Sequence, residues 1–390
     1  MELRECAERV FDICKNADWY GYDPYDGLNS VLFQKTPFFK IKIAKQIVTQ
    51  AVKNSPFNVR PLLLISKGRN SKALALFAAG LLRLFKCTHD ERYAHEARSV
   101  LSVLESLIIK GYSGACWGYN FPWQSRQFYA PRNTPNAICT TFAAQSFLDA
   151  YDVLHDEKYL AIAEQSARFI VKDLHRTEHH NLLCFSYTPL DHSRVHNVNL
   201  LAAFLLARVG KYNNSSSYMN DALRAALYSI DCQHADGSWF YGTASNQKWI
   251  DGFHTGYNIA ALKSLRDIID DNRLEEPIKR GLTYYDSNFF LHDGTPRYYH
   301  DNTYPIDIHS AAQGMITYCM MSSYDKGYIN KAEKLFQWTI TNMLDASGYF
   351  YFQKKRLYTI KIPYIRWAQA WMYYAITFLI YHTQGEQRAD

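Results

Sequence analysis

The polar segment from His292 to Gln313 carries the residue types most able to transfer protons. It starts with an Asp-Gly turn signal, contains three closely spaced tyrosines and ends in the first turn of an apolar stretch. A phenol or an imidazole can act as a general base or acid, and long polar segments between helices are commonly functional. The residues predicted to exchange a proton are Tyr304 and His309, with Tyr298 or His300 assisting.

Similar polar and aromatic residues precede the other apolar stretches. They lie in residues 70–72, 117–136, 191–199, 236–257 and 361–369. Indole rings suit stacking on sugar rings, whereas Arg and amide groups suit a carboxylate, so we expect Arg366 and Asn133 to hold one. The candidate substrate-binding residues are Trp117, Trp123, Arg126, Asn133, Asn136, Trp239, Trp249, Asp251, Tyr257, Tyr364 and Gln369, and the further candidate catalytic residues are His254, Asp307 and Arg366.

Four of the polar residues in these segments also have a purely structural interpretation. Asn70, Asn136, Asp251 and Asp307 stand directly before predicted helices, where N-cap residues belong. Capping does not account for the neighbouring histidines, the arginine or the indoles. Both interpretations therefore stay open for these four residues.

Two other chemistries compete with proton abstraction for these residues. A facing pair of carboxylates would favour glycoside hydrolysis, and the available residues are Asp251, Asp307 and Asp26. Asp251 and His254 are spaced like the first two ligands of a zinc site, but no third ligand appears at a matching spacing. We therefore expect no metal and no cofactor, and the Tyr, His, Arg and Asn inventory favours abstraction of a proton next to a carboxylate.

An internal repeat predicts the elements that hold these segments. Phe77-Ala78-Ala79 recurs as Phe142-Ala143-Ala144, an offset of 65 residues (142 − 77). Apolar helices are predicted to begin near residues 71, 137, 196, 253, 308 and 366. A more amphipathic helix follows each of the first five, at residues 91–109, 158–173, 216–232, 274–288 and 327–343.

Six such units predict an all-α fold, an (α/α)6 toroid in which six apolar helices form an inner ring and six amphipathic helices an outer ring. The helix at 39–55 is the candidate for the sixth outer helix. We expect one domain over residues 1–390, with residues 1–37 packing on it as a helix and a loop. Short strands are predicted at 183–188 and 348–353.

The amino-acid composition indicates which kinds of partner this protein can bind. The chain has 48% hydrophobic and 15% aromatic residues and a net charge of +6, without a run of Lys or Arg. Nucleic-acid binding is therefore not expected, whereas a carbohydrate, including an anionic one, is compatible. No apolar run is long enough to cross a membrane, and the N-terminus lacks the apolar region of a signal peptide. Eight cysteines without a CxxC pair indicate free thiols, and we expect a cytoplasmic protein.

Five motifs, taken in order, resemble those of bacterial proteins associated with capsule, O-antigen and exopolysaccharide gene clusters. They are DPYDGLNS (23–30), WQSR with TPN (123–136), KWIDGFHTGY (248–257), YHDNTYPIDIHSAAQ (299–313) and YIRWAQAWM (364–372). The resemblance implies a role in making or modifying a surface polysaccharide. It also implies possible association with other proteins of polysaccharide assembly.

More distantly, the chain is similar to the helical catalytic domain of glucuronyl C5-epimerases and to other (α/α)6 sugar epimerases and polyuronate lyases. Gly294-Thr295 followed by Tyr298 matches one epimerase motif, and Tyr304 with His309 and Gln313 matches a second, at a spacing that differs by two residues. The resemblance implies epimerase- or lyase-like chemistry on a uronate-containing sugar. A glycoside hydrolase on the same scaffold and a non-catalytic glycan-binding protein are the alternatives.

Overall fold

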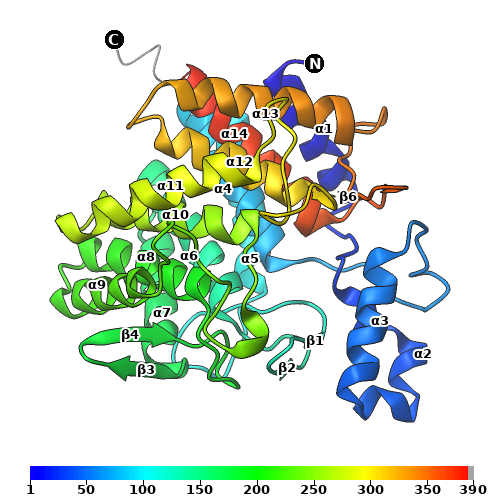
Figure 1. Ribbon diagram of the computed structural model, residues 1–390, viewed down its shortest axis with the longest axis horizontal. Helices are drawn as coiled ribbons and strands as arrows, with labels where there is room; N and C mark the ends of the chain where they lie inside the picture. Colours follow the sequence, from blue (N-terminus) through cyan, green and yellow to red (C-terminus); the bar gives the residue numbers. More distant parts are fainter. Residues whose placement is uncertain (385–390) are drawn as a thin grey trace.

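In the computed structural model, which describes residues 1–384, six helices labelled in Figure 1 pack one against the next into a closed inner ring. They are α4 (Ser71–Thr88), α6 (Ala137–Leu154), α8 (His196–Tyr212), α10 (Gly252–Arg266), α12 (Ile308–Met321) and α14 (Trp371–Gln384). Each packs against the next, and α14 packs against α4. Side chains are buried on all sides of these helices, which explains why their sequences carry almost no charge.

Five helices of the outer ring each follow the inner helix on which they pack. They are α5 (Glu91–Ser106), α7 (Glu157–Asp173), α9 (Ser216–Asp231), α11 (Glu275–Phe289) and α13 (Gly327–Met343). Each buries one stripe of apolar side chains, such as Ala97, Val100 and Leu104 of α5, and leaves its polar face exposed. The predicted (α/α)6 toroid is confirmed.

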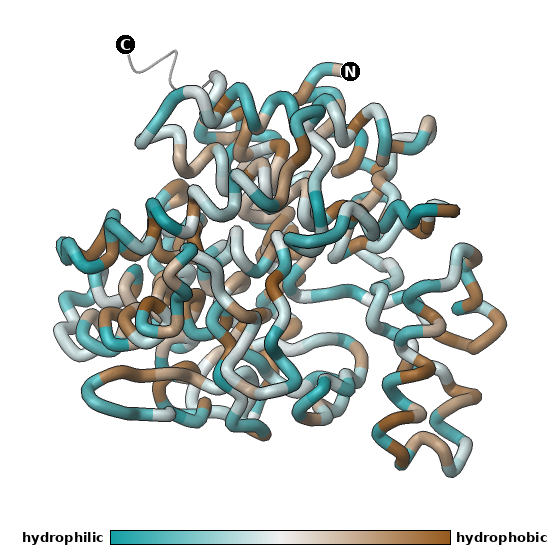
Figure 2. Tube along the Cα trace, in the orientation of Figure 1, coloured by the Kyte–Doolittle hydropathy of each residue, from teal (hydrophilic) through white to brown (hydrophobic). Residues whose placement is uncertain are grey.

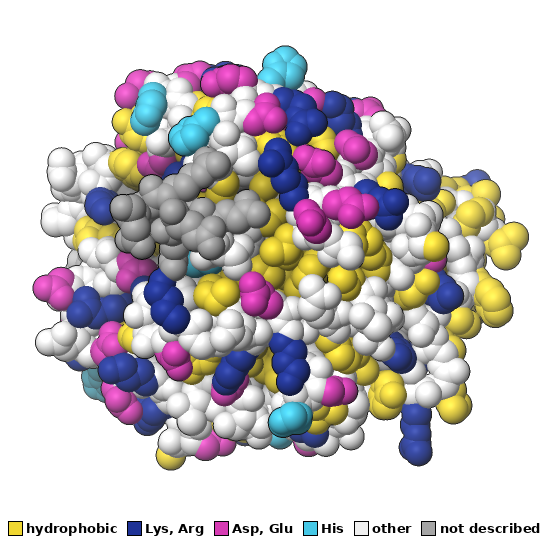
Figure 3. Space-filling model, turned by 90° about the horizontal axis from the view of Figure 1, so that it is seen from above, with side chains coloured by type: hydrophobic (Ala, Val, Ile, Leu, Met, Phe, Trp, Pro, Cys, Tyr) yellow, Lys and Arg dark blue, Asp and Glu magenta, His cyan; other side chains and the backbone are white. Residues whose placement is uncertain are grey.

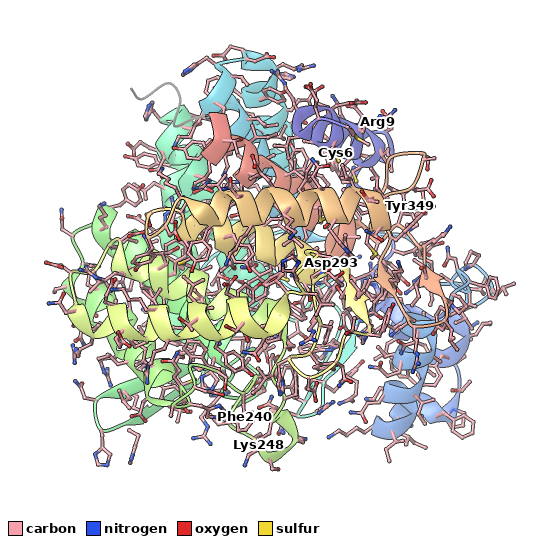
Figure 4. The ribbon with its side chains drawn as sticks, turned by 45° about the horizontal axis from the view of Figure 1, so that its top comes forward. Cys6, Arg9, Phe240, Lys248, Asp293 and Tyr349 are labelled. Carbon is pink, nitrogen blue, oxygen red and sulfur yellow. The ribbon has the colours of Figure 1, made fainter. Side chains whose placement is uncertain are left out.

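The sixth outer helix is α1 (Leu3–Asn16), which packs on α14. Its Cys6 and Val10 are buried, whereas Arg9 lies on the outward face (Figure 4). The prediction that a helix at 39–55 closes the ring was therefore wrong. That sequence forms α3 (Lys42–Asn54), which packs instead on the 3-10 segments η1 (Asp26–Asn29) and η2 (Pro37–Lys40).

Residues 31–64 form a separate projection at the side of the ring, which we call the α2–α3 module. It contains α2 (Val31–Gln34), η2, α3 and the loop after α3 (Figures 1 and 2). The Arg60 guanidinium, which is fully buried, donates to Asp26 Oδ1 at 2.7 Å and to the Asp23 carbonyl at 2.8 Å. These bonds hold the end of the module against the segment that follows α1.

Short antiparallel strands brace the loops that precede the inner helices. β1 (Trp123–Gln124) pairs with β2 (Tyr129–Ala130), β3 (Arg176–His179) with β4 (Leu182–Phe185), and β6 (Gln353–Lys354) with both β5 (Ile306–Asp307) and β7 (Thr359–Ile360). The strand predicted at 183–188 overlaps β4, whereas the one predicted at 348–353 reaches β6 only at its last residue.

All four residues proposed as N-caps do cap helices. The side chains of Asn70, Asn136, Asp251 and Asp307 accept hydrogen bonds from backbone N–H groups in the first turns of α4, α6, α10 and α12. The sixth inner helix begins differently, with the π-helical segment η5 (Ile365–Ala370) directly before α14. Such π-helical turns occur frequently at functional sites.

None of the eight cysteines forms a disulfide bond, in agreement with the prediction. Within residues 1–384, no helix combines the length and the apolar character needed to cross a membrane.

The ring-closing position of α1 can be tested by charging its buried face. We expect Val10→Asp to lower the free energy of unfolding by about 3 kcal/mol or more, because the new carboxylate would be buried without a partner. Arg9→Gln, one residue away on the exposed face, should change it by less than about 0.5 kcal/mol. Urea unfolding followed by circular dichroism measures both. Equal effects of the two substitutions would contradict the placement of α1.

Candidate active site

One cavity of about 550 Å³ lies at the end of the ring where the inner helices begin. Each inner helix contributes a residue from or near its first turn, namely Lys72, Ile138, Asn197, His254, His309 and Arg366. The loops before these helices and one face of α3 complete the wall. The repeat architecture thus brings residues from far apart in the sequence to one place.

His254 is oriented by a buried carboxylate. Its Nδ1 lies 2.7 Å from Asp251 Oδ2, and its backbone N–H donates to Asp251 Oδ1 at 2.9 Å. The Trp249 indole N–H also donates to this carboxylate, at 2.8 Å. Because Asp251 engages Nδ1, Nε2 is left as the ring nitrogen available to accept a proton, and the carboxylate would stabilise the imidazolium so formed.

Lys72, Tyr257 and His309 form a second group, which we call the buried triad. The Tyr257 hydroxyl lies 2.5 Å from His309 Nε2 and 3.4 Å from Lys72 Nζ. Lys72 Nζ also sits over the Trp371 and Phe142 rings, 4.8 and 4.3 Å from their centres. The amino group therefore contacts ring faces and one hydroxyl, and none of its described contacts is a carboxylate.

Burial sets the protonation states of the buried triad. It lowers the pKa of Lys72 and of His309 well below their ordinary values, and the positive charge of Arg366 acts in the same direction on both. Burial also raises the pKa of Tyr257 well above its ordinary value. At neutral pH His309 is therefore neutral and Tyr257 keeps its proton, so the phenol can act as a donor.

Arg366 is paired, in contrast to Lys72. Its Nε and Nη2 donate to the two carboxylate oxygens of Asp23 at 2.6 and 2.7 Å, and both side chains are buried. Although burial alone would lower the pKa of Arg366, the Asp23 carboxylate raises it above the ordinary value. The guanidinium thus stays charged at the cavity wall while most of its charge is neutralised by Asp23.

Aromatic rings make up much of the remaining wall. Tyr241 stacks on Trp249 with ring centres 4.4 Å apart, and the Arg126 guanidinium lies 4.5 Å from the Trp249 ring centre. On another side, Trp123 packs 5.1 Å from Tyr187. All five residues line the cavity and offer the flat faces on which sugar rings stack.

Several buried polar atoms at the cavity have no hydrogen-bond partner among the described residues. They are Asn197 Oδ1, Gln247 Oε1 and His309 Nδ1. Buried polar atoms are almost always paired in native proteins. A water molecule or a ligand group that reaches these atoms would supply the missing partners.

The lining of the cavity contains basic but no acidic side chains among the described residues. Lys53, Lys72, Arg126 and Arg366 line it, and no Asp or Glu of residues 1–384 is among its lining residues. Such a lining favours an anionic ligand. It gives no facing pair of carboxylates of the kind that glycoside hydrolases use.

Eight of the residues predicted from the sequence line this cavity. They are His254, Tyr257, Tyr298, His309, Arg366, Trp123, Arg126 and Trp249. Asp251 lies directly behind them, through its bonds to His254 and Trp249.

Three predicted residues do not line the cavity and lie in loops or at the surface of the protein. Tyr304 is 41% exposed, and Asn133 occupies an exposed turn with a φ of 60°. His300 is half-buried, with Nδ1 3.4 Å from the Ile250 carbonyl. The structure therefore does not bring Tyr304 and His309 together, and Asn133 does not join Arg366.

Six other predicted residues belong to the packing around the cavity. The indoles of Trp117 and Trp239 are buried, and their N–H groups donate to the Leu104 and Ser229 carbonyls at the ends of α5 and α9. A buried indole offers no face for a sugar. The others are Asp307, held by Trp367 and Gln353; Gln369, bonded to the Phe350 backbone; the helix cap Asn136; and the buried ring Tyr364.

Lys72 is the main site residue that was not selected from the sequence. Its only signal is a single charge within the otherwise uncharged run Ser71–Leu82, which a surface lysine would not show. Asp23 was part of a quoted motif, but its pairing with Arg366 across 343 residues has no local signature. For metal binding, no three His, Cys, Asp or Glu side chains within residues 1–384 are grouped closely enough to share an ion.

No protein-family profile matches the chain, and no curated protein matches it in sequence. An unsaturated glucuronyl hydrolase specific for heparin superposes over 99% of this chain and 98% of its own, with a TM-score of 0.65 and 13% identity. A cellobiose 2-epimerase from Bacillus thermoamylovorans covers 80% of this chain and 87% of its own, with a TM-score of 0.62 and 12% identity. A D-mannose isomerase covers 81% and 87%, with a TM-score of 0.62 and 11% identity. At these identities, what the chain shares with them is the (α/α)6 fold.

The protonation state of His309 gives a test by nuclear magnetic resonance. Its pKa is depressed in the folded protein, so we expect its ring to stay neutral well below pH 6.5, its ordinary value. The unfolded chain binds this proton and the folded chain does not, so His309 makes the protein less stable as pH falls below about 6.5. A pH titration of ring-labelled histidines, with His309→Gln to assign the signal, measures the state directly. A His309 ring that titrates near pH 6.5 would contradict its burial.

Proposed function

We propose that this protein is a carbohydrate-active enzyme that moves a proton at the carbon next to the carboxylate of a uronate-containing sugar, as an epimerase or a lyase does. The observation that carries the proposal is the cavity lining, which combines four Lys or Arg side chains, two proton-handling groups and sugar-sized aromatic faces without a carboxylate. The resemblance of its motifs to proteins of capsule and exopolysaccharide gene clusters supports a bacterial surface polysaccharide as the substrate. Eight cysteines without a disulfide bond support a reducing compartment, the cytoplasm.

In this mechanism His254 is the base. Its Nε2 would take the proton from C5 of the uronate, and the electron pair of the broken C–H bond would move into the carboxylate as an enediolate. Asp251 would stabilise the resulting imidazolium through Nδ1. The enediolate carries one more negative charge than the substrate carboxylate, so a cation nearby is required.

Lys72 is our candidate for that cation. We take Lys72, whose pKa burial depresses, to be uncharged in the free enzyme, and a carboxylate beside its Nζ would raise this pKa so that the group takes up a proton on binding. Arg366 is less suited, because Asp23 already satisfies two of its donor groups. Its role would be to depress the pKa of Lys72 in the free enzyme and to border the sugar at the cavity wall.

Tyr257 would return a proton to C5. The hydroxyl stays protonated in the free enzyme, and neutral His309 can accept or relay a proton through the 2.5 Å contact. The ring centres of His254 and Tyr257 lie 6.1 Å apart, so one sugar ring can lie within reach of both. In epimerisation Tyr257 gives its proton to the opposite face of C5 and is reprotonated from solvent through His309, while the His254 imidazolium releases its proton to solvent. In elimination the enediolate electron pair forms the C4–C5 double bond, the C4–O bond breaks, and the departing oxygen takes the Tyr257 proton.

Glycoside hydrolysis is less well supported by this arrangement. The three carboxylates available for it have structural partners: Asp251 and Asp307 cap helices, and Asp26 pairs with Arg60. A non-catalytic glycan-binding protein would need the aromatic wall but not the His254–Asp251 pair.

The role of Lys72 predicts an affinity that depends on the substrate's carboxylate. We expect Lys72→Met to weaken binding of a glucuronate-containing disaccharide at least about tenfold and to leave its glucose counterpart nearly unaffected, because a hydrogen bond to a charged group contributes about 1.5–3 kcal/mol. The matched control is Lys248→Met, an exposed lysine of the loop before α10 that lies outside the cavity (Figure 4).

Calorimetry in buffers of different ionisation enthalpy measures both affinity and proton uptake. Uptake by the wild-type protein, and its loss in Lys72→Met, is the expected result. If the substitution weakens the binding of both sugars equally, or if proton uptake persists in the variant, Lys72 does not hold the carboxylate.

The reaction is tested by incubating the protein with glucuronate-containing disaccharides in deuterated water. We expect deuterium at C5 or a C4–C5 double bond, and a loss of at least about 100-fold in rate for His254→Gln, within the range of general base catalysis. New reducing ends without unsaturation would instead support a hydrolase. Tight binding with no reaction, unchanged in His254→Gln, would support the glycan-binding alternative.

A further inference from the structure

Large exposed apolar side chains concentrate on the α2–α3 module. Phe57 and Leu62 are each 78% exposed and Ile43 is 66% exposed. The others in this module are Val31, Leu32, Phe38, Ile41, Ile47 and Leu64. Figure 3 shows hydrophobic side chains gathered at the right-hand edge, on the side where the module projects in Figure 1. Single exposed apolar residues are ordinary, but a concentration of this kind marks an interaction surface.

The helix α3 turns polar side chains inward and apolar side chains outward, the reverse of an ordinary surface helix. Gln46, Thr49 and Lys53 face inward and line the cavity, whereas Ile43 and Ile47 point to the outside. A helix that contacts only water on its outer face would carry polar residues there. The outer face of the module is therefore built for an apolar contact.

The charged side chains of the same module are all basic. No Asp or Glu occurs from residue 27 to residue 89. Among its cations Arg60 is neutralised by Asp26, whereas Lys35 and Lys40 are exposed beside the apolar side chains. The surface is therefore apolar with an uncompensated positive rim.

We propose that the outer face of the α2–α3 module docks on an anionic phospholipid bilayer. Apolar side chains would enter the interfacial region while each lysine near the surface adds about 1 kcal/mol of attraction to anionic headgroups. A symmetric dimer through this face would place the lysines of two copies against one another, which is unfavourable. The proposal concerns surface binding and stands apart from the proposed reaction.

Docking in this way would hold the cavity close to the membrane. The inner face of α3 lines the cavity and its outer face would contact lipid, so the two are separated by one helix diameter, about 10 Å. The cavity would then sample saccharides presented at the bilayer surface. Membrane docking would thus explain why the module that forms one wall of the cavity also projects from the ring with an apolar outer face.

Co-sedimentation with lipid vesicles tests the proposal without any sugar substrate. Vesicles of phosphatidylcholine alone are compared with vesicles that also contain phosphatidylglycerol. The apolar variant carries Ile43→Ser, Ile47→Ser and Phe57→Ser, and the charge variant carries Lys35→Gln and Lys40→Gln. The matched controls are Leu190→Ser, an exposed leucine far along the chain that is 57% exposed, and Lys248→Gln.

We expect the wild-type protein and both controls to bind the anionic vesicles and to bind neutral vesicles much more weakly. Each module variant should lose roughly tenfold or more in partition, because about 1 kcal/mol per lysine and more per buried apolar side chain is removed. All the substituted residues are exposed, so melting temperatures should be unchanged, and circular dichroism checks this.

Three outcomes would overturn the proposal. The first is absence of binding to the anionic vesicles, and the second is binding that both module variants retain. The third is a concentration-dependent dimer in analytical ultracentrifugation that the apolar variant abolishes, which would assign the face to self-association.

Discussion

The structure depends on a buried ionic network that joins the two ends of the chain at the cavity. Asp23 binds Arg366 of η5 through both oxygens, its backbone N–H donates to Asp26, and Asp26 binds Arg60. Burying four charges is costly unless each is paired with good geometry, as these are. The network fixes the α2–α3 module against the sixth inner helix, and it neutralises Arg366 while Lys72 nearby keeps no carboxylate partner among its described contacts.

The nitrogen-containing side chains of the cavity therefore differ in how their charges are paired. One arginine is fixed and paired, one lysine is buried against aromatic rings with a depressed pKa, and one histidine is oriented by a carboxylate behind it. A ligand that brings its own carboxylate would complete the set, because it would charge Lys72 and place a polarisable C–H bond near His254. Neutral sugars would use the aromatic walls but would leave Lys72 without a counter-charge.

Much of the fold could be predicted from the sequence because each repeat unit encodes its own helices locally. The inner helices are recognisable by their lack of charge, and the caps Asn70 and Asp307 by their position. The sixth outer helix could not be assigned, since α1 and α3 are both amphipathic and only long-range packing on α14 separates them. At the site, His254 and His309 stood out by residue type. Burial, which removes Trp117 from the cavity and leaves Tyr304 at the surface, is a tertiary property that residue types do not encode.

The central claim is that the cavity binds a uronate through its carboxylate, and a crystal structure of the protein soaked with a glucuronate-containing disaccharide tests it most directly. The account predicts the sugar ring in the cavity, its carboxylate within hydrogen-bond distance of Lys72 Nζ, and its C5 facing His254 Nε2. A sugar bound in the cavity with its carboxylate directed to solvent, or with C5 turned away from both His254 and Tyr257, would contradict the account.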